Sequence, residues 1–160
     1  MERINRSFIS KNSPWFFIIM AAVVFVLDQI TKHLIKTNVT PFDVIRVLPF
    51  FNIVYAENVG SAFGMFKSLG NAFFVSIASL AAVVITVMIW RDKENRLELS
   101  LILGGAAGNL ADRIIYGYVI DFLDVHVAGH HWPAFNVADS ALSVGTTLMI
   151  VKMLLPKPKT

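Results

Sequence analysis

The chain contains no cysteine among its 160 residues, and charged residues make up only 16% of it. The missing thiols exclude disulfides, thiolate metal sites, a cysteine nucleophile and a lipid anchor on a cysteine of this chain. A soluble domain usually has about a quarter charged residues. With 56% hydrophobic residues and a mean hydropathy of +0.64, residues 1–160 are predicted to form a single integral membrane domain.

Two other signals are absent from the sequence. No basic patch with interleaved aromatic residues is present, so we expect no nucleic-acid partner. The first apolar run, Trp15 to Leu27, follows basic residues as in a signal peptide, but no small-x-small cleavage site comes after it. We therefore expect this run to be an uncleaved first span.

Long apolar runs fill most of the chain. A spanning helix needs roughly 20 mostly apolar residues, and a membrane barrel would need alternating polarity, which these runs lack. The sequence therefore predicts an all-α membrane protein, a bundle of four transmembrane helices. The predicted spans cover residues 15–36, 71–90, 97–116 and 137–155.

The segment between the first two spans, about residues 37–70, differs from a plain linker. Residues 44–48 and 51–55 are rich in β-branched and aromatic side chains and are separated by Pro49, which predicts two short strands. Residues 62–66 predict a short interfacial helix. We expect a small β-rich extracytoplasmic segment between helices 1 and 2.

Basic residues predict the orientation of the bundle. They occur in the N-terminal tail, in the loop 91–96 and in the C-terminal tail, whereas residues 117–135 contain no lysine or arginine. The positive-inside rule places such clusters in the cytoplasm. Both termini are therefore predicted to be cytoplasmic, with the loops after the first and third spans on the outer side.

Polar residues gather near the outer ends of three predicted spans. Because these spans alternate in direction, they deliver the polar side chains to one side of the membrane, where intramembrane charges usually mark a functional site. Asp28 and Lys32 share a helix face, and Gly104 and Gly108 form a small-xxx-small pair that lets another helix approach. The remaining residues of the group are Gln29, Asn109, Asp112, Arg113, Asn136 and Asp139.

Structural roles are also compatible with these residues. Asp28 with Lys32 can be a structural ion pair, and Asp112 beside Arg113 can be structural too. Asn136 can cap the fourth helix, whose dipole would favour Asp139. The spacing alone therefore leaves open whether Asp121 and Asp139 are a catalytic pair.

Three further interpretations concern the loops and the serines. His126, His130 and His131 with Asp124 suggest a metal site, but Gly129 and Pro133 interrupt any helix there. We expect no metal and no cofactor, and we expect Asp124 to be solvated in a loop. Ser140 or Ser61 with a lysine would suggest a serine–lysine peptidase, but no lysine lies at the depth of Ser140.

Five stretches in this order resemble the lipoprotein signal peptidases, also called signal peptidase II. They are residues 27–32 (LDQITK), 58–64 (NVGSAFG), 104–113 (GGAAGNLADR), 119–122 (VIDF) and 135–140 (FNVADS). The resemblance implies an aspartic endopeptidase of the bacterial cytoplasmic (inner) membrane with its active site near the outer leaflet. Such enzymes remove the signal peptide of prolipoproteins just before a cysteine that carries a diacylglyceryl group.

The resemblance also implies residue roles and partners. Asp121 and Asp139 would be catalytic and would activate water. Globomycin-type cyclic peptides would be inhibitors, membrane lipids would surround the chain, and we expect a monomer. The supporting or substrate-binding residues would be Asp28, Lys32, Asn58, Gly60, Asn109, Asp112, Arg113 and Asn136.

Two other functions remain as alternatives at this point. A small transporter or channel subunit would use intramembrane charges for an ion path, and would distribute them through the membrane depth. A non-catalytic membrane assembly factor would tolerate asparagine in place of the aspartates. The polar residues of this chain gather at one depth, which favours the peptidase.

Overall fold

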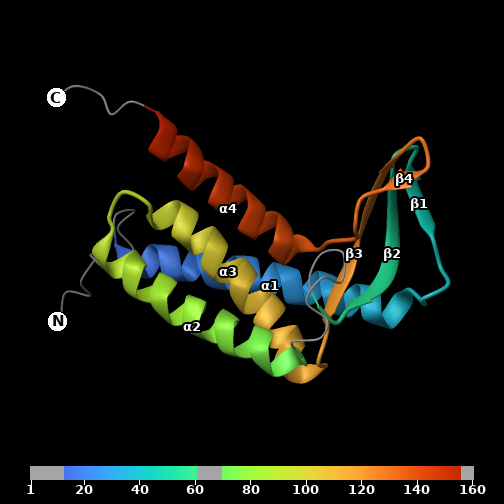
Figure 1. Ribbon diagram of the computed structural model, residues 1–160, viewed down its shortest axis with the longest axis horizontal. Coiled ribbons are helices and arrows are strands. Elements are labelled where there is room, and N and C mark those ends of the chain that lie inside the picture. The colour runs from blue at the N-terminus through green and yellow to red at the C-terminus, as the bar shows by residue number, and fades with distance from the viewer. Residues whose placement is uncertain (1–12, 61–69, 156–160) are drawn as a thin grey trace, which may run out of the picture.

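Four helices and a four-stranded sheet make up the described part of the computed structural model, residues 13–60 and 70–155 (Figure 1). Each helix begins and ends within two residues of a predicted span. Pro14 opens the first helix, where its missing N–H costs no hydrogen bond. The helices are α1 (Pro14–Asn38), α2 (Gly70–Arg91), α3 (Arg96–Ile115) and α4 (Val137–Leu154).

Three of these helices, α1, α2 and α4, are long and apolar enough to cross a membrane. The helix α3 is as long but less apolar, and it buries Arg96, Glu98 and Asp112. It can do so because it packs against all three other helices. The prediction of a helical membrane protein is confirmed for the three apolar helices, and a fourth span by α3 stays a prediction.

Glycines on α3 allow its neighbours to approach closely. A Cβ atom built on Gly104 would lie 2.6 Å from the backbone oxygen of Ala21 on α1. A Cβ on Gly105 would collide with the backbone oxygen of Ala138 on α4. The predicted role of small residues in helix packing is therefore confirmed for Gly104.

The sheet lies across one end of the bundle, and its strands run across the helix axes (Figure 1). The strands pair antiparallel in the order β1-β2-β3-β4. The two strands predicted around Pro49 are confirmed as β1 and β2. The strands are β1 (Ile45–Leu48), β2 (Phe51–Asn58), β3 (Val119–Val127) and β4 (His130–His131).

The sheet extends beyond the predicted segment between the first two helices. The strands β3 and β4 come from the connection between α3 and α4, and β3 pairs with β2 from Phe51↔Val125 to Asn58↔Val119. Two paired strands alone are only marginally stable, and a third strand stabilises them. For β1 and β2 that third strand is β3, which is distant in the sequence. The predicted helix at residues 62–66 lies outside the described residues.

Substitution of Gly104 by alanine tests the close packing of α1 on α3. Alanine favours an exposed helix by about 1 kcal/mol over glycine, but at Gly104 overpacking is expected to lower the free energy of unfolding by about 1–3 kcal/mol. Thermal unfolding in detergent micelles measures the change. Ser76→Ala on an exposed face of α2 is the control and should stay within about 0.5 kcal/mol. Stabilisation by Gly104→Ala would contradict the packing argument.

Candidate active site

A buried lysine lies between two buried aspartates of α1 and α3. The Nζ atom of Lys32 is 2.8 Å from Asp28 Oδ2 and 3.0 Å from Asp112 Oδ2, and it donates a 3.0 Å hydrogen bond to Asn109 Oδ1. The side chains of Asp28, Lys32 and Asp112 are 0%, 2% and 1% exposed. The predicted pair of Asp28 and Lys32 is therefore confirmed, and Asp112 pairs with the same lysine.

The two aspartates also bind backbone amides at the starts of two elements. Asp28 Oδ1 accepts a 2.8 Å hydrogen bond from the Ala138 N–H in the first turn of α4. Asp112 Oδ2 accepts a 3.0 Å hydrogen bond from the Ile120 N–H in β3. The ion-pair cluster thus connects α1 and α3 to β3 and α4, which carry Asp121 and Asp139.

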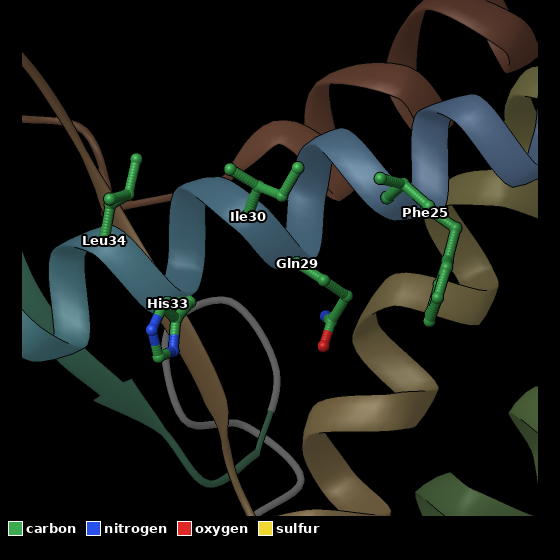
Figure 2. Close-up of a pocket in the computed structure, with 6 residues that line it drawn as sticks. Phe25, Gln29, Ile30, His33 and Leu34 are labelled. Carbon is green, nitrogen blue, oxygen red and sulfur yellow. The ribbon is translucent and has the colours of Figure 1, made fainter.

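Gly108 and Gln29 complete the surroundings of this cluster. A Cβ on Gly108 would collide with Asp28 Oδ2, so only glycine leaves room for the carboxylate. Gln29 Nε2 donates to Asp112 Oδ1 at 3.0 Å and to the Gly108 carbonyl at 3.2 Å. Figure 2 shows the Gln29 amide directed from α1 toward α3. Gln29 is not among the predicted site residues. Its position next to Asp28 and three residues before Lys32 is the sequence feature that could have indicated its place in this cluster.

Asn136 forms hydrogen bonds with both Asp121 and Asp139. Its Nδ2 donates to Asp121 Oδ1 at 2.7 Å, and its Oδ1 accepts from the Asp139 N–H at 2.8 Å. Asp139 Oδ2 accepts in return from the Asn136 N–H at 3.2 Å, which makes a capping box at the start of α4. The predicted capping role of Asn136 is confirmed, and the residue connects the two aspartates: its side-chain amide binds the Asp121 carboxylate and its backbone N–H binds the Asp139 carboxylate.

Asn109 links this pair to the buried lysine. Its Nδ2 donates to Asp139 Oδ1 at 2.7 Å, while its Oδ1 accepts from Lys32 Nζ and from Asn136 Nδ2 at 3.0 and 3.1 Å. Each amide atom of Asn109 therefore has an assigned partner, which fixes the orientation of the side chain.

Asn58, Gly60 and Arg113 close the network on the side of β2. Asn58 Nδ2 donates to Asp121 Oδ2 at 3.0 Å, and Asn58 Oδ1 accepts from the Gly60 N–H at 3.1 Å. Arg113 donates to the Gly60 carbonyl and to the Asn109 carbonyl, both at 3.3 Å. All ten predicted site residues thus lie in one connected network.

The environment of Asp121 favours its protonated form. Burial, followed by the nearby charge of Asp139, raises the pKa of Asp121 to about 7, although hydrogen bonds from Asn58 and Asn136 oppose the rise. A carboxyl group with a pKa near neutrality can donate a proton at physiological pH. The pair Asp121 and Asp139 can therefore supply an acid and a base at one place.

A cavity of about 300 Å³ lies beside Asp139. Its walls are mainly apolar and include Phe135, Trp132 and Val144, with Ser140 and Ser143 of α4 between them. This space lets a substrate segment with apolar groups lie next to the carboxylate.

The prediction that Asp124 is solvated in a loop is wrong. Asp124 lies in β3, is only 7% exposed, and accepts hydrogen bonds from Asn52 Nδ2 at 2.8 Å and from His131 Nδ1 at 2.7 Å. Burial alone would raise the pKa of Asp124, but these two hydrogen bonds hold it below the usual value. The cross-strand pair Asn52↔Asp124 explains the error, because β3 was not predicted.

The metal and serine interpretations find no support in the described part of the chain. No group of three histidines or acidic residues there is arranged to hold a metal ion. Ser140 Oγ donates to the Asn136 carbonyl, whereas Lys152 pairs with Glu98, about 18 Å away along α4. Ser61, the other candidate, lies outside the described residues.

Substitution of Lys32 by methionine tests the buried cluster. Two carboxylates would then be buried without a cation, so we expect the free energy of unfolding to fall by about 3–5 kcal/mol. Thermal or denaturant unfolding in detergent micelles measures the loss, and Asp28→Asn in the same chain should restore part of it. Lys36→Met is the matched control, because Lys36 lies one turn further along α1, is exposed, and has a ring contact with Tyr116 but no buried carboxylate partner among the described residues. Equal stability of the two methionine variants would refute the role assigned to Lys32.

Comparison with known proteins agrees with the motifs. Residues 20–155 match the family model described as signal peptidase (SPase) II. A lipoprotein signal peptidase of Thermodesulfovibrio yellowstonii is 50% identical over 132 residues, which is 82% of this chain and 90% of the relative. One of Janthinobacterium sp. is 44% identical over 155 residues, 91% of this chain and 93% of the relative.

Solved structures give the same result. A bacterial membrane enzyme is similar with a TM-score of 0.81 and 31% identity, over 91% of this chain and 94% of that one. A second one has a TM-score of 0.79 and 33% identity, over 90% and 94%. Fold, motifs and sequence identity over most of the chain thus agree. The chain belongs to the signal peptidase II family and is a membrane protease.

Proposed function

We propose that Asp121 and Asp139 are the catalytic pair of an aspartic endopeptidase that removes the signal peptide of diacylglyceryl-modified prolipoproteins. The observation that carries the proposal is that Asn136 donates to both carboxylates, from its side-chain amide to Asp121 and from its backbone N–H to Asp139. Family membership favours this function over the transporter and the assembly factor, and no feature of the described residues favours a second function.

The membrane placement is part of the proposal. With α3 as a fourth span, the α2–α3 loop and both termini lie on the same side of the membrane. The starts of α1 and α3 and the ends of α2 and α4 lie together at one end of the bundle, and the sheet lies at the other (Figure 1). The positive-inside rule assigns the basic end to the cytoplasm of the bacterial inner membrane. The aspartate pair then lies near the outer leaflet.

This depth suits a substrate that is held by lipid. A signal peptide has an apolar stretch that lies in the bilayer, and the diacylglyceryl chains of the modified cysteine lie in the outer leaflet. The bond before that cysteine is therefore near the level of Asp121 and Asp139. The apolar cavity beside Asp139 gives the substrate room at the scissile bond.

In the reaction, ionised Asp139 takes a proton from a water molecule, and the hydroxide formed adds to the scissile carbonyl carbon. Protonated Asp121 donates a hydrogen bond to the developing oxyanion. When the C–N bond breaks, the amine of the lipidated cysteine takes the proton of Asp121 and the signal peptide leaves as a carboxylic acid. The proton that Asp139 took from water then passes to Asp121 and restores the starting state. The dipole of α4 favours the ionised form of Asp139, whereas burial favours protonated Asp121.

The supporting residues orient this pair. Lys32 and Asn109 position Asp139, and Asn58 positions Asp121. The N–H and carbonyl of Gly60 bind Asn58 and Arg113, so a substrate backbone that contacts Gly60 must replace one of these hydrogen bonds. Globomycin-type cyclic peptides would bind between the two aspartates, and the enzyme would act as a monomer among membrane lipids.

Replacement of Asp121 or Asp139 by asparagine tests the pair. Either variant should lose about 10²–10⁴-fold in kcat on a lipidated precursor in detergent, because a general acid or base is removed. Asp43→Asn, in the exposed outer segment, should retain nearly full activity. Thermal unfolding checks that all three variants are folded. Near-normal turnover by either site variant would refute the assignment.

The pH dependence of kcat/KM tests the state of Asp121. Because the reaction needs protonated Asp121, the rate should fall as the pH rises through about 7. The hydrogen bond from Asn58 stabilises the ionised form, so Asn58→Ala should raise the pKa and move this fall to higher pH. A shift to lower pH, or no alkaline fall in the unmodified enzyme, would contradict the role of Asp121 as the acid.

A further inference from the structure

A second cavity, which has polar walls, lies at the end of the sheet that is far from Asp121. It has a volume of about 440 Å³, and Arg46, Asn52, His126 and His131 contribute to its walls. His126 follows Asp121 by five residues on β3, so this end is about 17 Å along the strand from the catalytic pair. Figure 1 shows this end of the sheet, near β4 and β1, on the side away from α2.

The strand register brings the polar side chains of this cavity to one face. Arg46 pairs with Asn52, Asn52 pairs with Asp124, and His126 pairs with His131. Residues directly opposite in antiparallel strands point to the same face, and so do residues two apart, such as Asp124 and His126. Strands from two distant segments of the chain, one before α2 and one after α3, therefore place these polar side chains on one face. We call Arg46, Asn52, Asp124, His126 and His131 the polar array.

Buried contacts hold the histidines of the array in place. Both oxygens of Asp124 are engaged by Asn52 and His131, and Asp124 itself does not line the cavity. The ring of His131 stacks on that of His126, with centroids 4.7 Å apart and 25° between the planes. Within residues 13–60 and 70–155, no hydrogen bond or ion pair engages the Arg46 side chain. Arg46 and His126 are therefore available as donors to an anion.

The rim of the cavity is apolar and exposed. Val44 and Leu48, which line it, are exposed, and so are Phe42 and Phe50 next to it in the chain. Phe42 is 95% exposed. A soluble anion or an acidic peptide would need no such rim, whereas lipid at a membrane surface would cover it. A cationic centre inside an apolar rim matches a phospholipid, whose phosphate adjoins its acyl region.

We propose that this cavity binds the phosphate of an anionic phospholipid of the outer leaflet, with Arg46 and His126 as the donors. The guanidinium of Arg46 can contact two phosphate oxygens, and the His126 N–H a third. The proposal relies on the membrane placement given above and is independent of the cleavage reaction. The bound lipid would hold the tip of the sheet at the membrane surface.

The four histidines of the chain provide the probe. Protein with ¹³C-labelled histidine rings is placed in phosphatidylcholine nanodiscs, and phosphatidylglycerol is added in increasing mole fraction. The NMR signals of His126 and His131 should shift and saturate, whereas that of His33 on α1 should not. Arg46→Gln should weaken the apparent affinity about tenfold, because one charge-assisted contact is lost. Arg91→Gln, at the other end of the bundle, is the matched control and should leave it unchanged.

Three outcomes would overturn the proposal. They are the absence of a saturable shift, an equal shift of His33, and an unchanged response in Arg46→Gln. A separate arm uses inorganic phosphate in phosphatidylcholine nanodiscs, and an equal response there at millimolar concentration would show a free-anion site instead of a lipid site. Arg46→Gln should still cleave a lipidated precursor, so failure of this proposal is distinguishable from failure of the proposed function.

Discussion

The buried ammonium group of Lys32 is the interaction on which the active-site end of the molecule depends. It has three N–H donors, and it has three partners: Asp28, Asp112 and Asn109. A buried charge is stable only when it is paired and fully hydrogen-bonded. Because the three partners come from two helices, this requirement fixes α1 against α3 in position and in depth.

The same requirement extends from the helices to the sheet. Asp28 and Asp112 each bind one further backbone N–H, of Ala138 in α4 and of Ile120 in β3. The backbone next to Asp121 and Asp139 is therefore held in place by these hydrogen bonds. Asn136 and Asn109 then orient the two carboxylates by hydrogen bonding to them. The site is positioned by a network of buried polar groups, and the apolar helix faces outside it are left to meet lipid.

Much of this arrangement could be predicted from the sequence. The apolar runs predicted the helix limits to within two residues, and the spacing of Asp28 and Lys32 predicted their pairing. Gly104 predicted a close helix approach. Such features depend on neighbours a few residues apart, so the local sequence is sufficient. The strand β3 cannot be predicted from its neighbours, because its partners in β2 are 61 to 74 residues away in the sequence, and the burial of Asp124 follows from this pairing.

The sequence by itself determined the membrane class, the apolar helices and the family motifs, and the resemblance pointed to the candidate site residues. Only the tertiary structure decided that Asp112 pairs with Lys32, that Asn136 joins Asp121 to Asp139, and that Arg46 and His126 share a cavity. The physical reason is that hydrogen bonds and ion pairs act over a few ångströms. Which groups come that close depends on helix packing and strand register, and both are set by contacts between distant parts of the chain.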